Sequence, residues 1–145
     1  AQYVERCLLS INNEAIRSGI SQSEYEIIIV DDCSSDNTIE RTLEYFNHLN
    51  LSNGKVICHH TNRKQGAARN TGLRVANGDY VWFVDIDDSI GDGILKYLHS
   101  SELSSPPDIF QFHAASKDPS NNIVIEPGKS QLGLCQELTI WNLKQ

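Results

Sequence analysis

The chain has 145 residues, of which 39% are hydrophobic, and its formal net charge is −7. This length and composition are typical of one globular domain that buries a core. The acidic charge argues against a general nucleic-acid binder, whose binding surface is normally basic. Every apolar run is shorter than the ~20 residues of a membrane-spanning helix, so we expect no such span in the sequence.

Four cysteines lie far apart along the chain, at positions 7, 33, 58 and 135. They lack the Cys-x-x-Cys spacing of zinc and redox sites, so we expect reduced thiols in a cytosolic domain. The chain also contains no methionine and starts within a helical pattern. We therefore expect further segments to belong to the protein.

Helices and strands are predicted to alternate along the first hundred residues. In chain order they are a helix at 3–18, a strand at 26–30, a helix at 36–49, a strand at 55–59, a helix at 65–76, a strand at 80–84 and a helix at 91–101. Apolar residues at helical spacing predict the helices, and short β-branched runs predict the strands. Such alternation is typical of βαβ units, so the predicted fold class is α/β, with a mainly parallel sheet flanked by helices.

The pattern changes after Pro106 and Pro107. Residues 109–113 and 122–126 are predicted to form short strands, and residues 132–143 a helix.

Two of the predicted strands end in clustered carboxylates. The buried run Tyr80–Val84 is followed by Asp85–Asp88, and the run Ile27–Val30 is followed by Asp31 and Asp32. Ligands of open α/β sheets bind beyond the carboxyl ends of the strands. Crowded carboxylates repel one another unless a cation such as Mg²⁺ or Mn²⁺ neutralises them. Each cluster alone also fits a solvated acidic turn, but two together predict a ligand site.

A basic segment lies between the two acidic strand ends. Arg63, Lys64 and Arg69 gather around the start of the predicted helix at 65–76 in an otherwise acidic chain. Helix N-termini attract phosphate through their free N–H groups and their dipole. The alternative is an ordinary solvated helix start whose small residues pack on the sheet.

Three segments together resemble a known family. Residues 30–38 read VDDCSSDNT, residues 66–73 read GAARNTGL and residues 78–88 read GDYVWFVDIDD. They are similar to the VDDGSSDNT, GxxxARNxGL and GDYIxFLDxDD segments of the inverting family 2 glycosyltransferases of the GT-A fold, with Cys33 in place of the usual glycine. The opening YVERCL is similar to that family's YLxxCLxSI helix. The resemblance covers about residues 1–100.

The resemblance implies a nucleotide-sugar site made of Asp31, Asp32, Ser34, Lys64, Arg69, Asp85, Ile86 and Asp88. Asp31 or Asp32 would accept hydrogen bonds from the base or ribose. Arg69, assisted by Lys64, would hold the base or the diphosphate. Asp87 would ligate Mn²⁺ or Mg²⁺ directly. Asp85, the second metal residue, would contact the ribose or the hydration shell of the metal. Asp88 would lie in the outer shell of the metal or contact the donor sugar.

The implied activity is that of a hexosyltransferase-type glycosyltransferase. It would move a sugar with inversion from a nucleotide-diphosphate donor, most commonly a UDP-sugar, to a saccharide, lipid-linked or other hydroxyl acceptor. The implied setting is polysaccharide synthesis for the cell envelope, in the cytoplasm or at the inner face of the membrane. Any membrane association would come through segments outside this sequence.

Residues 1–145 would form one GT-A domain without its first strand and without the region that carries the general base. Residues 1–104 would bind the donor, and residues 105–145 would begin the acceptor side. We expect the missing first strand to leave a neighbouring strand edge bare.

Other classes remain open from the residues alone. A catalytically inactive GT-A domain would bind nucleotide sugars without transferring them. A receiver-type signalling domain would use Asp31 and Asp32 as its acidic pair and Asp85 as phosphoacceptor, but it leaves residues 66–73 unexplained. A nucleotidyltransferase shares the sheet but needs a glycine- and arginine-rich first loop. Donor, acceptor and oligomeric state stay open.

Overall fold

The computed structural model describes residues 1–99, 115–117, 123–125 and 137–143. The chain divides into two compact units, residues 1–99 together with 135–145, and residues 100–134. The elements of the first unit are α1 (Val4–Ser18), β1 (Tyr25–Asp31), α2 (Thr38–His48), β2 (Gly54–Cys58), α3 (Gln65–Val75), β3 (Tyr80–Asp85), α4 (Ile94–Leu98) and β6 (Glu137–Leu143). The second unit contains β4 (Ala115–Lys117) and β5 (Ile123–Ile125).

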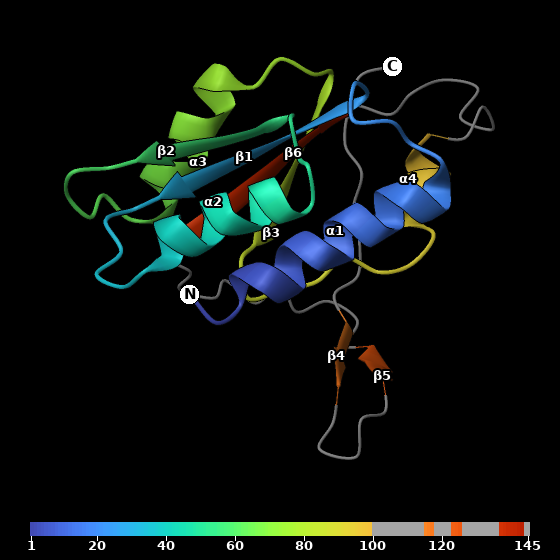
Figure 1. The fold of residues 1–145 in the computed structure, drawn as a ribbon, viewed down its shortest axis with the longest axis horizontal. Coiled ribbons are helices and arrows are strands. Elements are labelled where there is room, and N and C mark those ends of the chain that lie inside the picture. The colour runs from blue at the N-terminus through green and yellow to red at the C-terminus, as the bar shows by residue number, and fades with distance from the viewer. Residues whose placement is uncertain (100–114, 118–122, 126–136, 144–145) are drawn as a thin grey trace. The chain divides into compact units, whose positions relative to one another are not determined.

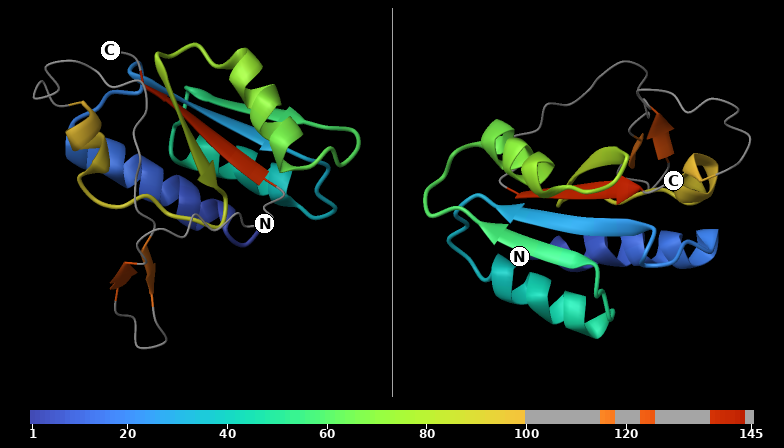
Figure 2. Two further views of the ribbon diagram at one scale, coloured as in Figure 1. Left: turned by 180° about the vertical axis from the view of Figure 1, so that it is seen from behind. Right: turned by 90° about the horizontal axis from the view of Figure 1, so that it is seen from above.

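Four strands of the first unit form one sheet in the order β2-β1-β6-β3 (Figure 1). β1 and β2 are parallel, whereas β6 is antiparallel to both β1 and β3, so β1, β2 and β3 run in the same direction. Helices α1 and α2 cover one face of this sheet and α3 covers the other (Figure 2). The predicted α/β class with a mainly parallel sheet is confirmed.

Strand β1 lies at the centre of the core because both of its faces are covered. The side chains of Ile27 to Val30 are at most 1% exposed, which explains why the sequence here is a continuous β-branched run. On one face of the sheet, Ala68 of α3 packs with Ile28 and Val30. Helix α1 buries the stripe that its spacing predicted, made of Val4, Cys7, Leu8, Ile11 and Ala15.

The prediction of a helix at 132–143 is wrong for residues 137–143, because Glu137–Leu143 forms strand β6. Residues 132–136 lie outside the described residues. A short run with apolar residues at 138, 140, 141 and 143 fits both the spacing of a helix and the alternation of a strand. As a strand it pairs along its whole length with β1 on one side, and with β3 on the other. Two ladders satisfy its backbone groups.

The second unit contains an antiparallel pair in which Ser116 of β4 lies opposite Val124 of β5. Strand β5 confirms the strand predicted at 122–126. The strand predicted at 109–113 lies outside the described residues. Within the part of the chain that the structure describes, no helix is long and apolar enough to cross a membrane.

Candidate functional site

The two acidic strand ends meet at one edge of the sheet. Strands β1 and β3 run in the same direction, and each ends at an aspartate, Asp31 and Asp85. Strand β6 lies between them, with Glu137 paired to Asp31 and Leu138 paired to Asp85. Two strand spacings separate the aspartates, or roughly 10 Å between backbones. The shared edge predicted for the two clusters is therefore present.

Strand β6 also brings Glu137 to this edge, at a register position between the two aspartates. The sequence interpretation missed this residue because it placed 132–143 in a helix. The available signal was the apolar run that follows Glu137, which has the length of a strand.

The carboxylate of Asp31 closes the turn that follows β1. It is 2% exposed and accepts the backbone N–H of Ser34, with distances of 3.3 Å to Oδ1 and 3.2 Å to Oδ2. This bond brings two of the predicted nucleotide-sugar residues, Asp31 and Ser34, into direct contact.

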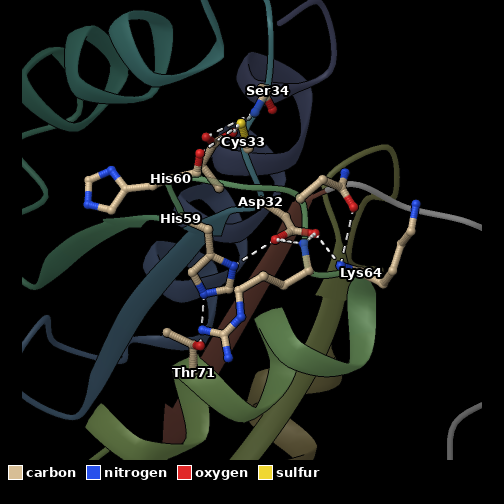
Figure 3. A network of polar contacts seen from close by, with 10 residues as sticks. Asp32, Cys33, Ser34, His59, His60, Lys64 and Thr71 are labelled. Atoms are coloured by element: carbon tan, nitrogen blue, oxygen red, sulfur yellow. Dashed lines mark hydrogen bonds and ion pairs between the residues drawn. The ribbon is translucent and has the colours of Figure 1, made fainter.

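Asp32 is the centre of a larger polar network (Figure 3). It is 1% exposed. Its Oδ1 accepts from the backbone N–H of Arg63 at 2.9 Å and lies 2.6 Å from His59 Nδ1. Its Oδ2 accepts from the N–H of Arg63 at 2.9 Å and of Lys64 at 2.6 Å. Burial raises the pKa of Asp32, but these hydrogen bonds outweigh burial and hold the pKa below its usual value.

The network continues from Asp32 into helix α3. The second ring nitrogen of His59, Nε2, lies 2.9 Å from Thr71 Oγ1. The loop after β1, the end of β2 and helix α3 are thus joined through one imidazole, while the neighbouring His60 points away (Figure 3). Sequence reasoning missed this connection because Asp32 and His59 are 27 residues apart.

Two residues beside Asp32 adopt backbone conformations that favour glycine. Cys33 has φ of 68°, and Lys64 has φ of 72° with ψ of 161°. The Cys33 position is the one where the resembling family has glycine. Counted four residues back from Ala68, the glycine of the GxxxARNxGL pattern falls on Lys64, not on Gly66. Side chains at both positions therefore impose backbone strain next to Asp32.

Arg69 joins the basic segment to the second acidic strand end. Its Nη2 lies 3.5 Å from Asp85 Oδ1, and its guanidinium carbon lies 5.5 Å from the centre of the Phe83 ring. Gln65 Nε2 donates to the same Asp85 oxygen at 3.4 Å. The Nε of Arg69 is buried and has no hydrogen-bond partner among the described residues. The contacts of Arg69 and Gln65 with Asp85 Oδ1 are both long, so they hold the Asp85 carboxylate only weakly.

The acidic segment after β3 has exposed carboxylates between two buried isoleucines, Ile86 and Ile90. Ile86 is 6% exposed and anchors the segment, whereas Asp87 and Asp88 are exposed. Burial raises the pKa of Asp85, and the charge of Asp87 raises it further against the lowering effect of Arg69. Burial, followed by the charges of Asp87 and Asp85, also raises the pKa of Asp88. Both carboxyl groups are therefore harder to ionise than a free aspartate.

The described residues contain no group of three or more His, Cys, Asp or Glu side chains arranged to hold a metal ion. Asp85 and Asp87 alone could contribute one or two carboxylate ligands to a cation. Mg²⁺ is commonly bound in this way, with substrate phosphates and water completing its shell.

The site thus combines two acidic strand ends with a basic helix start, on an α/β sheet of the kind that binds nucleotides at the carboxyl ends of its strands. The family model described as "Glycosyl transferase family 2" matches residues 1–122. The chain belongs to this family. This membership excludes the receiver-type interpretation.

Relatives of known name support the same assignment. The chain is 38% identical over 93 residues to the poly(ribitol-phosphate) beta-N-acetylglucosaminyltransferase TarS of Staphylococcus aureus strain Mu50, covering 63% of this chain and 16% of TarS. It is 34% identical over 88 residues to the putative glycosyltransferase EpsH of Bacillus subtilis, covering 61% of this chain and 23% of EpsH. The crystal structure of S. aureus TarS 1-349 superposes with a TM-score of 0.54 at 33% identity, covering 66% of this chain and 26% of that one. The chain therefore spans about a quarter or less of these relatives.

Proposed function

We propose that the full-length protein transfers a sugar from a nucleoside-diphosphate donor, a UDP-sugar, to a hydroxyl of a saccharide polymer or lipid-linked saccharide. Transfer inverts the anomeric carbon and is assisted by Mn²⁺ or Mg²⁺. The observation that carries the proposal is the shared edge, where Asp31 and Asp85 flank one strand and Arg69 of α3 reaches Asp85.

The donor is proposed to lie across this edge. Asp31, at the end of β1, would accept hydrogen bonds from the base or ribose. Arg69 and the exposed Lys64 would hold the diphosphate, because they bring positive charge to an otherwise acidic edge. Asp32 already accepts hydrogen bonds from three residues, so its role in donor binding would be to hold the loop that carries Lys64.

A divalent cation fits the segment after β3. Asp85 and Asp88 have raised pKa values because burial and neighbouring charges disfavour their ionised forms. A cation held by Asp87 and Asp85 would relieve this repulsion, and Asp88 would lie in its outer shell. When bound, the metal would neutralise the departing nucleoside diphosphate as a Lewis acid.

The acceptor class follows from named relatives. TarS and a beta-glucosyltransferase of Bacillus spizizenii are both named for poly(ribitol-phosphate), and the second is 34% identical to this chain over 101 residues. We propose a cell-envelope polymer with free hydroxyls as acceptor. Direct displacement needs a general base within hydrogen-bond reach of that hydroxyl, and we expect this base outside residues 1–145.

The test is donor turnover by the full-length protein with a panel of UDP-, GDP- and dTDP-sugars and polymer acceptors. Released nucleoside diphosphate and the anomeric form of the product would be measured with Mn²⁺ and with excess chelator. We expect a UDP-sugar to be used only with metal. Asp87→Asn should lower turnover roughly 10- to 100-fold, if loss of a ligand resembles loss of a supporting contact. Glu40→Gln, an exposed carboxylate-to-amide change on α2, is the matched control. Undiminished transfer in chelator would refute the metal-assisted mechanism.

A further inference from the structure

One face of helix α1 contacts the backbone of the segment that follows β3. Arg6, Ser10 and Glu14 are spaced four residues apart, so their side chains leave the same side of the helix. Residues 87–95 run past this side. They start at the acidic cluster and end inside α4.

Each of the three side chains holds a different point of this segment. The guanidinium of Arg6 donates to the backbone carbonyl of Asp87. The Oγ of Ser10 accepts the N–H of Ile90 at 3.1 Å, while its own hydroxyl donates to the carbonyl of Cys7 at 2.8 Å. The Oε1 of Glu14 accepts the N–H of Leu95, also at 3.1 Å. Successive turns of the helix therefore bind successive points of the segment.

Glu14 is the least expected of the three, because it is 1% exposed on an otherwise apolar stripe. Its Oε1 also accepts from Ser18 Oγ at 3.0 Å, and its Oε2 is buried without a hydrogen-bond partner among the described residues. Burial of a carboxylate costs stability unless its oxygens are hydrogen-bonded, and only Oε1 has such partners among the described residues. The N–H of Leu95 has no partner within α4, because it belongs to the first turn of that helix.

Buried apolar side chains also anchor the segment. Ile86 and Ile90 are 6% and 8% exposed, and Leu95 is fully buried. The exposed Asp87 and Asp88 lie between the buried Ile86 and Ile90. With its backbone bound to α1 and its apolar side chains in the core, the segment leaves its carboxylates facing solvent.

We propose that Arg6, Ser10 and Glu14 are positioning residues that hold residues 87–95 so that the carboxylate of Asp87 stands at the donor site. The inference rests on the proposed function, since Asp87 is proposed to ligate the metal that accompanies the donor diphosphate. Displacement of a catalytic group by about 1 Å can lower a rate roughly 100-fold, so backbone contacts remote from the substrate matter. Helix α1 would then act as a template for the acidic segment in addition to covering the sheet.

The test uses four variants of the full-length protein. Ser10→Ala removes a half-buried acceptor, and Arg6→Ala removes an exposed donor, so both are expected to fold. Glu14→Gln keeps an oxygen that can accept the Leu95 N–H, so amide exchange at Leu95 should stay at the wild-type rate, and faster exchange there would show that the hydrogen bond alone does not hold this point. Asn13→Ala, at an exposed position of α1 whose side chain makes no hydrogen bond or ion pair with the described residues, is the matched control.

Two readouts separate positioning from simple stabilisation. Amide hydrogen exchange of the nucleotide-free protein should speed up about fivefold at Ile90 in Ser10→Ala, the change expected from one lost hydrogen bond, with Leu95 unchanged. Calorimetry with Mn²⁺ and UDP should show weaker binding in Ser10→Ala and Arg6→Ala, with metal-free UDP binding equal to wild type. A purely structural role would shift both affinities equally or neither.

Unchanged exchange at Ile90, or unchanged Mn²⁺-dependent UDP affinity in both alanine variants, would overturn the inference. A wild-type protein that binds no nucleoside diphosphate at all would instead refute the proposed function and, with it, the role of Asp87. The exchange comparison would then still decide whether α1 holds the segment.

Discussion

The two acidic strand ends carry the same sequence signal but differ in how the protein compensates their charge. Asp32, after β1, is 1% exposed and accepts hydrogen bonds from two backbone N–H groups and His59, which hold its pKa below the usual value. Asp85, the last residue of β3, and Asp88, three residues further on, have raised pKa values. Asp32 is a satisfied structural anion, whereas the cluster after β3 retains repulsion that a bound cation would relieve. A pair of aspartates at a strand end therefore has no fixed role. The hydrogen-bond partners of the carboxylates decide whether the pair stabilises the fold or is open to a ligand.

The largest effect that this comparison predicts is on stability. Asp32→Ala would leave the buried ring of His59 and two backbone N–H groups without their acceptor. We expect the free energy of unfolding of the full-length protein to fall by about 3 kcal/mol in urea titrations, as when one partner of a buried pair is removed. Asp92→Ala, which removes an exposed partner of Arg17, should change it by less than ~1 kcal/mol. Equal losses from the two variants would show that the Asp32 network is not a structural hub.

A smaller effect is expected on ligand affinity. Arg69→Ala removes the cation that faces Asp85 and that would pair with the diphosphate. We expect UDP affinity in calorimetry to fall about tenfold, the effect of one charge-assisted hydrogen bond. Arg74→Ala, an exposed arginine on the same helix, is the control. Equal affinities for both variants would assign Arg69 a structural role only.

Relief of backbone strain is expected to have a still smaller effect. Cys33 has φ of 68°, a conformation that glycine adopts without steric strain. Cys33→Gly should raise the free energy of unfolding by about 1 kcal/mol. Cys33→Ala keeps the Cβ atom while it removes the thiol, so it should show no gain. A gain of the same size in the alanine variant would attribute the effect to the thiol.

The smallest expected effect is a difference in pH dependence. The folded protein lowers the pKa of Asp32 below 3.8, so its ionisation contributes stability that is present above that pH and lost as pH falls through the folded pKa. Asp85 has a raised pKa, so stability falls as pH rises from 3.8 through its folded pKa. Between pH 3 and 7, the loss of unfolding free energy on acidification should therefore be smaller than in the wild type for Asp32→Asn and larger for Asp85→Asn. The same pH slope in both variants would contradict the difference between the two clusters.

Local sequence signals predicted the parts of the site that lie at strand ends. The β-branched run Ile27–Val30 predicted a strand. The aspartates that follow it predicted acidic side chains at the carboxyl end of that strand. The strand β6 could not be predicted in the same way, since its seven residues fit a helix or a strand and pairing with β1 and β3 decides between them. The bond between Asp32 and His59 depends on the β1–β2 register, which no local pattern contains.

Lys64 shows a different limit of prediction. Its side chain was predicted to assist the diphosphate, and it is exposed beside Asp32. Gly66 was predicted to stand at the glycine of the family pattern, whereas the glycine-like backbone conformation occurs at Lys64. Hydrogen bonds from the Lys64 N–H to Asp32 and to Asn62 accompany this conformation, and composition alone does not reveal them.

The central claim is that the cluster after β3 is completed by a cation that binds together with the donor. The most direct test is calorimetry of UDP binding to the full-length protein, with Mn²⁺ and with excess chelator, in the wild type and in Asp87→Asn. The proposal predicts that Mn²⁺ strengthens UDP binding roughly tenfold or more in the wild type and that Asp87→Asn abolishes this gain. Equal UDP affinity with metal and with chelator in the wild type would contradict it.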